Sequence, residues 1–164
     1  KMCFDIVEMA RRLLRKSRLV LEERRIDAST EGEERSLVSA DYDMIEQVLT
    51  NYITNAIDHA VGDNLLRVRI NNRADKVRVS VFNSGDPIPP ESIDSIWTSF
   101  YKTDKARTRE HGGTGLGLSI VKAIQDAHGN AYGAANVRGG VEFWFDVDAA
   151  PEAPETDLDM GVPG

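Results

Sequence analysis

At 164 residues, with 41% hydrophobic and 29% charged side chains, the chain has the size and composition of one globular domain. Residues 148–164 hold five acids and no base, which leaves 22 acids against 20 bases in residues 1–147. Most of the net charge of −7 is therefore confined to the C-terminal end, and the rest has no field that favours nucleic acid or an anionic membrane.

The single Cys3 excludes an internal disulfide and a cysteine-based metal cluster. No run of about 18 apolar residues exists, so we expect no direct membrane contact from this chain. Because the sequence opens on Lys1 and enters a helical pattern almost at once, we expect it to be part of a longer protein.

In chain order, the apolar spacing predicts an amphipathic helix over residues 4–25 and two short strands around a turn at residues 31–34. A second helix is predicted over residues 43–60, since its apolar residues repeat at i, i+3, i+4 and i+7. Asp41 or Asp43 can cap it, and Asp43 with Glu46 approximates a capping box.

The second half of the chain alternates between strand and helix patterns. Period-two alternation predicts a hairpin of residues 66–70 and 77–81, with one face of valine and isoleucine and one largely of arginine. We expect a short helix over residues 91–100, a charged loop over 102–113, and a helix that Gly129 ends. Strands are predicted over residues 131–137 and 141–147, and residues 148–164 form an acidic tail that we expect to be disordered.

Two asparagines on the 43–60 helix border its apolar face. Asn51 and Asn55 are four residues apart and therefore share one face, although asparagine is a mediocre helix former. An amide oxygen suits a hydrated Mg²⁺ whose other ligands are waters and phosphate oxygens. The alternative is a solvated helix face with no ligand.

A glycine cluster precedes the last helix. Gly113, Gly115 and Gly117 let the backbone approach a phosphate closely, and the helix N-terminus adds positive potential. Their spacing matches neither the P-loop nor the dinucleotide-binding fingerprint. A glycine-rich hinge without a ligand remains the alternative.

These segments together resemble the catalytic and ATP-binding domain of bacterial sensor histidine kinases, in the superfamily shared with gyrase, heat-shock chaperones and MutL. QVLTNYITNAIDHA resembles the N box, VFNSGDPIP the G1 box, IWTSFYKTDKAR the F box, and GGTGLGLSIVKAIQDAHGN the G2 box with its helix. GGVEFWFDV resembles the last strand. The resemblance implies an α+β fold for residues 1–147: a two-layer α/β sandwich of the Bergerat type, with a mixed, largely antiparallel sheet and three helices on one face.

The resemblance assigns roles on the asparagine helix. Asn55 matches the Mg²⁺ ligand, and His59 matches a position near the ribose and phosphates. Asn51 stands where gyrase-like members have a hydrolytic Glu, and an amide cannot act as a base. The site is thus suited to transferring the phosphoryl group to an acceptor other than water.

The remaining site residues come from the other boxes. Asn83 would accept from the adenine amino group, Gly85 would let the base lie against the backbone, and Ile88 would line the base pocket. The phosphate turn would be Gly113, Thr114, Gly115, Leu116 and Gly117, and the bases that neutralise phosphate charge would be Lys102, Lys105 and Arg107. Of these bases, Lys102 and Arg107 join Asn51 and Asn55 as the expected catalytic residues.

The resemblance implies a domain that binds Mg-ATP and delivers the γ-phosphate to a His on a separate dimerisation domain, from which a response regulator receiver takes it. None of His59, His111 and His128 has the phosphoacceptor context, so we expect no self-phosphorylation in isolation. The domain would be cytoplasmic, in a membrane-anchored sensor kinase. The alternatives are an ATP-hydrolysing relative and a degenerate nucleotide-sensing or docking domain.

The sequence departs from the family pattern at three positions. Asp58 stands where many sensor kinases have Lys, Asn83 replaces Asp, and Pro87 replaces the second glycine of the G1 box. We therefore expect modest ATP affinity.

Overall fold

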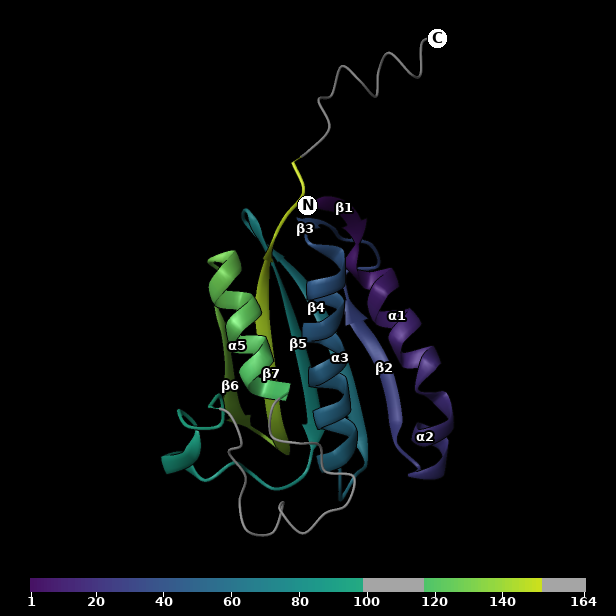
Figure 1. The fold of residues 1–164 in the computed structure, drawn as a ribbon. Helices are drawn as coiled ribbons and strands as arrows, with labels where there is room; N and C mark the ends of the chain where they lie inside the picture. Colours follow the sequence, from purple (N-terminus) through teal and green to yellow (C-terminus); the bar gives the residue numbers. More distant parts are fainter. Residues whose placement is uncertain (99–116, 152–164) are drawn as a thin grey trace.

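The computed structural model describes residues 1–98 and 117–151. A five-stranded sheet in the order β2-β4-β5-β7-β6 carries the helices on one face, and a two-stranded sheet of β1 and β3 lies beside it (Figure 1). The elements are β1 Met2–Asp5, α1 Ile6–Lys16, α2 Arg18–Glu23, β2 Asp27–Gly32, β3 Leu37–Ala40, α3 Tyr42–His59, β4 Leu65–Arg73, β5 Lys76–Ser84, the 3₁₀ turn η1 Pro90–Ser92, α5 Gly117–His128, β6 Tyr132–Val137 and β7 Gly140–Asp148. The predicted two-layer α/β sandwich is confirmed.

The N-terminal segment differs from the single helix predicted over residues 4–25. Residues 2–5 form β1, which pairs antiparallel with β3, and the helix begins only at Ile6. The Asp5 carboxylate caps it by accepting from the Val7 N–H at 3.0 Å, and it also accepts from the Ser36 N–H at 3.0 Å. A break at Ser17, whose hydroxyl donates to the Leu13 carbonyl, separates α1 from α2.

The central helix α3 lies between α1 and α5 on the covered face of the sheet (Figure 1). Asp41 is its N-cap, with its carboxylate accepting from the Met44 N–H at 3.0 Å. The capping box of Asp43 and Glu46 is wrong, because the Glu46 carboxylate pairs with Arg12 of α1 instead. The predicted apolar face is buried: Ile45, Val48, Leu49, Tyr52, Ile53, Ala56 and Ile57.

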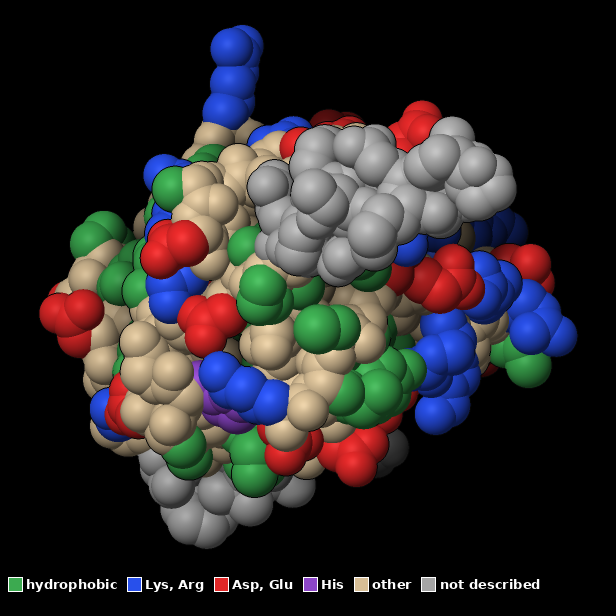
Figure 2. Space-filling model, turned by 90° about the horizontal axis from the view of Figure 1, so that it is seen from above, with side chains coloured by type: hydrophobic (Ala, Val, Ile, Leu, Met, Phe, Trp, Pro, Cys, Tyr) green, Lys and Arg blue, Asp and Glu red, His purple; other side chains and the backbone are tan. Residues whose placement is uncertain are grey.

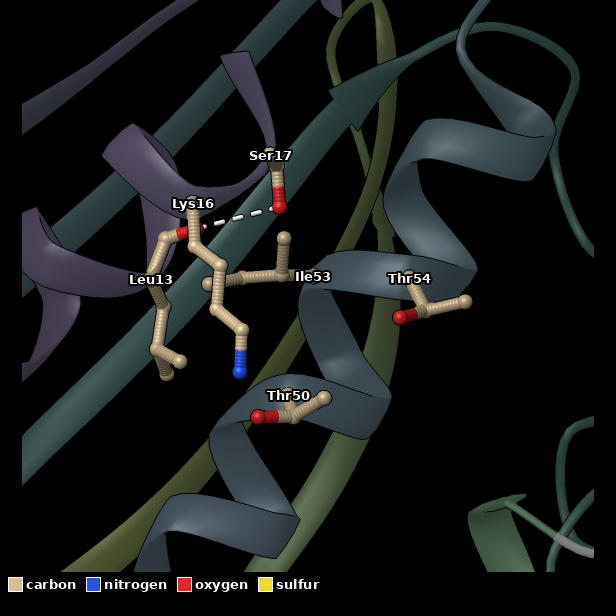
Figure 3. A pocket seen from close by; sticks show the side chains of 6 residues that line it. All are labelled: Leu13, Lys16, Ser17, Thr50, Ile53 and Thr54. Atoms are coloured by element: carbon tan, nitrogen blue, oxygen red, sulfur yellow. Dashed lines mark hydrogen bonds between the residues drawn. The ribbon is translucent and has the colours of Figure 1, made fainter. Parts of the chain in front are cut away.

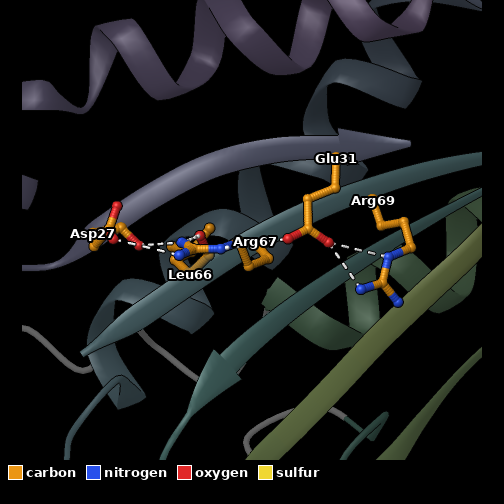
Figure 4. Close-up of polar contacts among 5 residues, drawn as sticks. All are labelled: Asp27, Glu31, Leu66, Arg67 and Arg69. Atoms are coloured by element: carbon orange, nitrogen blue, oxygen red, sulfur yellow. Dashed lines mark hydrogen bonds and ion pairs between the residues drawn. The ribbon is translucent and has the colours of Figure 1, made fainter. Parts of the chain in front are cut away.

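The predicted hairpin is confirmed as β4 and β5, joined at Ala74 and Asp75. Its apolar face packs under the helices, while Arg67 and Arg69 on the other face contact Asp27 and Glu31 of β2 (Figure 4). The two short strands predicted before α3 exist, but they do not pair with each other. β2 instead joins β4 in parallel, and β3 joins β1. The sheet is therefore mixed and largely antiparallel.

The segment after β5 is less helical than predicted. In place of a helix over residues 91–100, the structure has η1 and further turns up to Thr98; residues 99–116 lie outside the described part. Ile96 and Trp97 of this segment are nonetheless buried, and the Trp97 ring lies 6.0 Å from that of Phe143. Burial of these side chains holds the segment without a regular helix.

The C-terminal end extends the sheet beyond the predicted boundary at residue 147. β7 continues through Asp148, the Ala149 N–H donates to the Asp75 carbonyl, and the Ala150 N–H donates to the Leu37 carbonyl. Residues 148–150 therefore belong to the fold and not to a tail. The predicted disorder of residues 152–164 falls outside the described residues. Gly129 ends α5 as predicted, at a φ of +69°.

Within residues 1–98 and 117–151, every helix is too short or too polar to cross a bilayer. Seen from above, acidic and basic side chains are interspersed and not grouped by sign (Figure 2). That face therefore presents no single-sign field.

An ion pair closes the end of the sheet where β7 finishes. Lys76 Nζ lies 2.6 Å from Asp148 Oδ1 and donates to Asn130 Oδ1, also at 2.6 Å. The hydrogen bond from Lys76 lowers the pKa of Asp148, and the same bond raises the pKa of Lys76. β5, β7 and the end of α5 are thereby joined.

We expect the stabilisation from this pair to disappear in acid. A carboxyl whose folded pKa is lowered stabilises the fold above its unfolded pKa, about 4, and loses that effect as pH falls toward the folded value. The difference in Tm between the wild type and Lys76→Met should therefore shrink as pH falls from about 5 to about 2. Lys122→Met, which removes an exposed pair with Asp126, is the control. A difference that stays constant with pH would contradict the assignment.

Candidate functional site

The predicted site residues that the structure describes gather at one end of the sheet. At this end α3 and β5 finish and α5 begins (Figure 1). They are Asn51, Asn55, His59, Asn83, Gly85, Ile88 and Gly117. The predicted phosphate residues Gly113, Thr114, Gly115 and Leu116, and the bases Lys102, Lys105 and Arg107, lie outside the described residues.

Asn51 connects α3 to the start of α5. Its Nδ2 donates to the Gly117 carbonyl at 3.2 Å, so the asparagine helix sets the position from which α5 begins. Asn55, one turn further along the same face, is half-buried. The N-terminus of α5 and the two amides therefore lie at the same end of the molecule. Amide oxygens and a helix N-terminus are groups that suit a metal-bound phosphate.

Asn83 lies at the end of β5, between Leu66 of β4 and Val141 of β7. Its side chain is 2% exposed, and its Nδ2 donates to the Ser84 carbonyl at 3.1 Å. With the NH₂ group engaged in this way, the side-chain oxygen is the acceptor that remains for a donor such as an amino group. This orientation fits the role expected for Asn83.

Ser84, which the sequence did not single out, fastens the G1 strand to the chain that follows α3. Its hydroxyl donates to the Val61 carbonyl at 2.8 Å and accepts from the Leu65 N–H at 2.9 Å. A serine followed by glycine at a strand end was the available signal, but the partner could not be predicted from it.

Gly85 must be a glycine because of its backbone conformation and its contact with the end of α3. Its φ is +144°, and a Cβ at this position would lie 2.9 Å from the His59 carbonyl oxygen. Close approach to the last turn of α3 therefore excludes a side chain here, apart from any contact with a base. His59 is itself exposed at this end of α3.

The acid that departs from the family pattern has a basic neighbour. Asp58 Oδ1 lies 3.7 Å from Arg24 Nη1, and the Asp58 side chain is 11% exposed. The same Nη1 donates to the Ile57 carbonyl at 3.3 Å. Arg24, at the end of α2, thus places positive charge beside the acid. No local sequence signal links these two residues, because the contact is between separate helices.

We expect Arg24→Ala to weaken Mg-nucleotide binding about fivefold, because it removes the positive charge that Arg24 places beside the Asp58 carboxylate. Calorimetric titration measures the effect, which should decrease as salt is added. Asp58→Asn in the same protein should restore affinity. Arg25→Ala removes an equal charge from an exposed neighbour and is the matched control. An equal loss of nucleotide affinity in Arg25→Ala would contradict the role assigned to the Arg24–Asp58 pair.

A separate cavity of about 170 Å³ lies between α1 and α3 (Figure 3). Its lining comes from both helices and from Ser17: Leu13, Lys16, Ser17, Thr50, Ile53 and Thr54. None of the predicted site residues lines it. This cavity is therefore separate from the sheet end described above.

The geometry agrees with comparisons to known proteins. The family described as histidine kinase-, DNA gyrase B- and HSP90-like ATPase matches residues 40–151. This chain belongs to that ATPase family. The catalytic domain of the histidine kinase ThkA, in a nucleotide-free form, superposes with a TM-score of 0.79 at 35% identity, covering 92% of this chain and 98% of that domain.

The longer relatives that contain a similar segment are sensor kinases. The sensor protein kinase WalK of Staphylococcus saprophyticus is 41% identical over 101 residues, which cover 60% of this chain and 17% of that protein. ThkA in complex with the response regulator TrrA matches with a TM-score of 0.77 at 31% identity, covering 92% of this chain and 42% of that one. The chain is thus a histidine kinase ATPase domain, and it spans about a sixth of the length of the WalK relative.

Proposed function

We propose that this ATPase domain binds Mg-ATP and delivers the γ-phosphate to a His on a separate dimerisation domain, for transfer to a response regulator receiver. The observation that carries the proposal is the convergence of Asn51, Asn83 and the start of α5 at one end of the sheet. We further propose that the domain works in the cytoplasm as part of a membrane-anchored kinase.

The residues at this end have complementary chemistry for the nucleotide. The Asn83 oxygen accepts from the adenine amino group, and Asn55 supplies an amide oxygen to Mg²⁺. Bound Mg²⁺ neutralises charge on the triphosphate during phosphoryl transfer. The donor set fits a hydrated metal that keeps phosphate oxygens as ligands, because it offers neutral amides in place of a carboxylate cage.

Asn51 favours transfer over hydrolysis. An amide cannot take a proton from water, and the Nδ2 of Asn51 is already engaged with the Gly117 carbonyl. Asn51 therefore acts by holding α5 against α3. Because residue 51 is an asparagine, α3 has no carboxylate at this position that could activate a water molecule.

The test is titration of the domain with a non-hydrolysable ATP analogue, with and without Mg²⁺, followed by ATP with a dimerisation domain supplied in trans. Metal-dependent binding and acid-labile labelling of the added domain are expected. Steady-state phosphate release without an acceptor would support the hydrolytic alternative. Failure to bind at millimolar nucleotide would support the docking alternative, which Asp58 and Asn83 keep open.

A further inference from the structure

The turn between β6 and β7 contacts the segment that follows β5. Near the end of β6, Asn136 Oδ1 accepts from the Ile88 N–H at 2.8 Å. Its Nδ2 donates to the Ile88 carbonyl at 2.9 Å. One side chain thus makes both hydrogen bonds that a neighbouring strand would make to Ile88.

Ile88 is the residue at which this segment can be fixed. Pro87 and Pro89 on either side have no backbone N–H, so neither can donate to a support. The Ile88 side chain is half-buried and packs against the core. Asn136 therefore holds the main chain at the point where the segment turns its apolar side chain inward.

Two further contacts join the same turn to the G1 segment. The Gly85 N–H donates to the Gly139 carbonyl at 3.1 Å. At Gly140, a Cβ would lie only 2.0 Å from the Asn83 carbonyl oxygen, so the two backbones are in direct contact. Residues 136–140 therefore support residues 83–88 at both ends.

We propose that Asn136 is a positioning residue for the nucleobase: by fixing the Ile88 main chain, it sets the spacing between Ile88 and Asn83 across which an adenine is held. This inference rests on the proposed binding of ATP. It adds a residue near the end of β6, outside all four sequence boxes, to the determinants of base affinity and selectivity.

Because the Asn136 side chain is exposed, its two hydrogen bonds compete with water and add little to folding stability. Their loss should appear in binding and not in Tm. Asn136→Asp separates hydrogen bonding from shape, since the carboxylate has nearly the same size but sets an oxygen against the Ile88 carbonyl.

The experiment titrates a non-hydrolysable ATP analogue and its guanine counterpart, both with Mg²⁺, into the wild type, Asn136→Ala and Asn136→Asp. Both variants should bind the adenine nucleotide about tenfold more weakly and discriminate less against guanine, with Tm almost unchanged. The Ile88 amide should also exchange faster with solvent in both. Asn71→Ala, an exposed asparagine near the far end of β4, should behave as the wild type.

The proposal would be overturned if both variants kept the affinity and selectivity of the wild type. It would also be overturned if Asn136→Asp alone behaved as the wild type, because the shape of the Asn136 side chain and not its hydrogen bonds would then matter. A wild type that binds neither nucleotide would remove the proposed function itself and this inference with it. The two failures are distinguished by whether the wild type binds.

Discussion

Asn55→Ala is expected to weaken nucleotide binding in the presence of Mg²⁺ by roughly 100-fold, while affinity measured without metal stays nearly unchanged. The amide of Asn55 is the metal ligand that we propose for α3, at the end where α5 begins. Its removal takes away the interaction that depends on the metal and leaves the base contacts of Asn83. Parallel titrations in Mg²⁺ and in a chelator measure the difference.

The fold should tolerate this substitution, because alanine is the better helix former by roughly half a kcal/mol. Thr54→Ala is the matched control: it changes the adjacent, exposed residue of the same helix, on the side that faces α1. Equal affinity of Asn55→Ala and the wild type in Mg²⁺ would reject the metal role and leave the docking alternative.

Gly140→Ala is expected to lower the free energy of unfolding by about 3 kcal/mol and to abolish nucleotide binding. The added methyl would lie 2.0 Å from the Asn83 carbonyl oxygen, and backbone atoms on both sides must move to admit it. That movement displaces the strand end that presents the Asn83 side chain. Thermal unfolding should register a fall in Tm of about 10 °C.

The adjacent glycine gives the comparison for this clash. Gly139 has a φ of +86°, but an added Cβ would have no neighbour within 4 Å, so Gly139→Ala should cost only about 1 kcal/mol of backbone strain. A similar loss of stability in Gly139→Ala and Gly140→Ala would mean that backbone conformation, and not the contact with the Asn83 carbonyl, determines the effect at Gly140.

The helices and strands that were predicted correctly are those in which the spacing of apolar residues indicates the buried face. The alternation of Val77, Val79 and Val81 gave both the strand and its inward face, and the register of Val79 with Phe145 agrees with it. The apolar line of α3 was equally direct. Strand partners were not predictable, because the pairing of β2 with β4 depends on residues distant in the chain.

Local signals failed where a distant residue competed for the same group. Asp43 and Glu46 have the spacing of a capping box, but Glu46 pairs with Arg12 and Asp41 caps the helix. Residues 2–5 have an apolar pattern that a helix could use, but β3 supplies them with a strand partner.

The candidate site shows the same division. Asn51 and Gly117 were each predicted from their own segment, whereas the hydrogen bond between them was not. Support from Ser84, Arg24 and Asn136 is a property of the assembled fold, since each acts on a residue of another element. The roles assigned to Lys102, Lys105 and Arg107 stay predictions.

The parallel pairing of β2 with β4 has a consequence for the order of assembly. The β4–β5 hairpin closes through a two-residue link, whereas β2 can reach β4 only after the chain through β3 and α3 has crossed the sheet. Longer closures are entropically slower, so we infer that the β4–β5 hairpin forms before β2 joins β4. The nucleotide end, built from α3 and β5, would then be formed on a nucleus that does not need this edge strand.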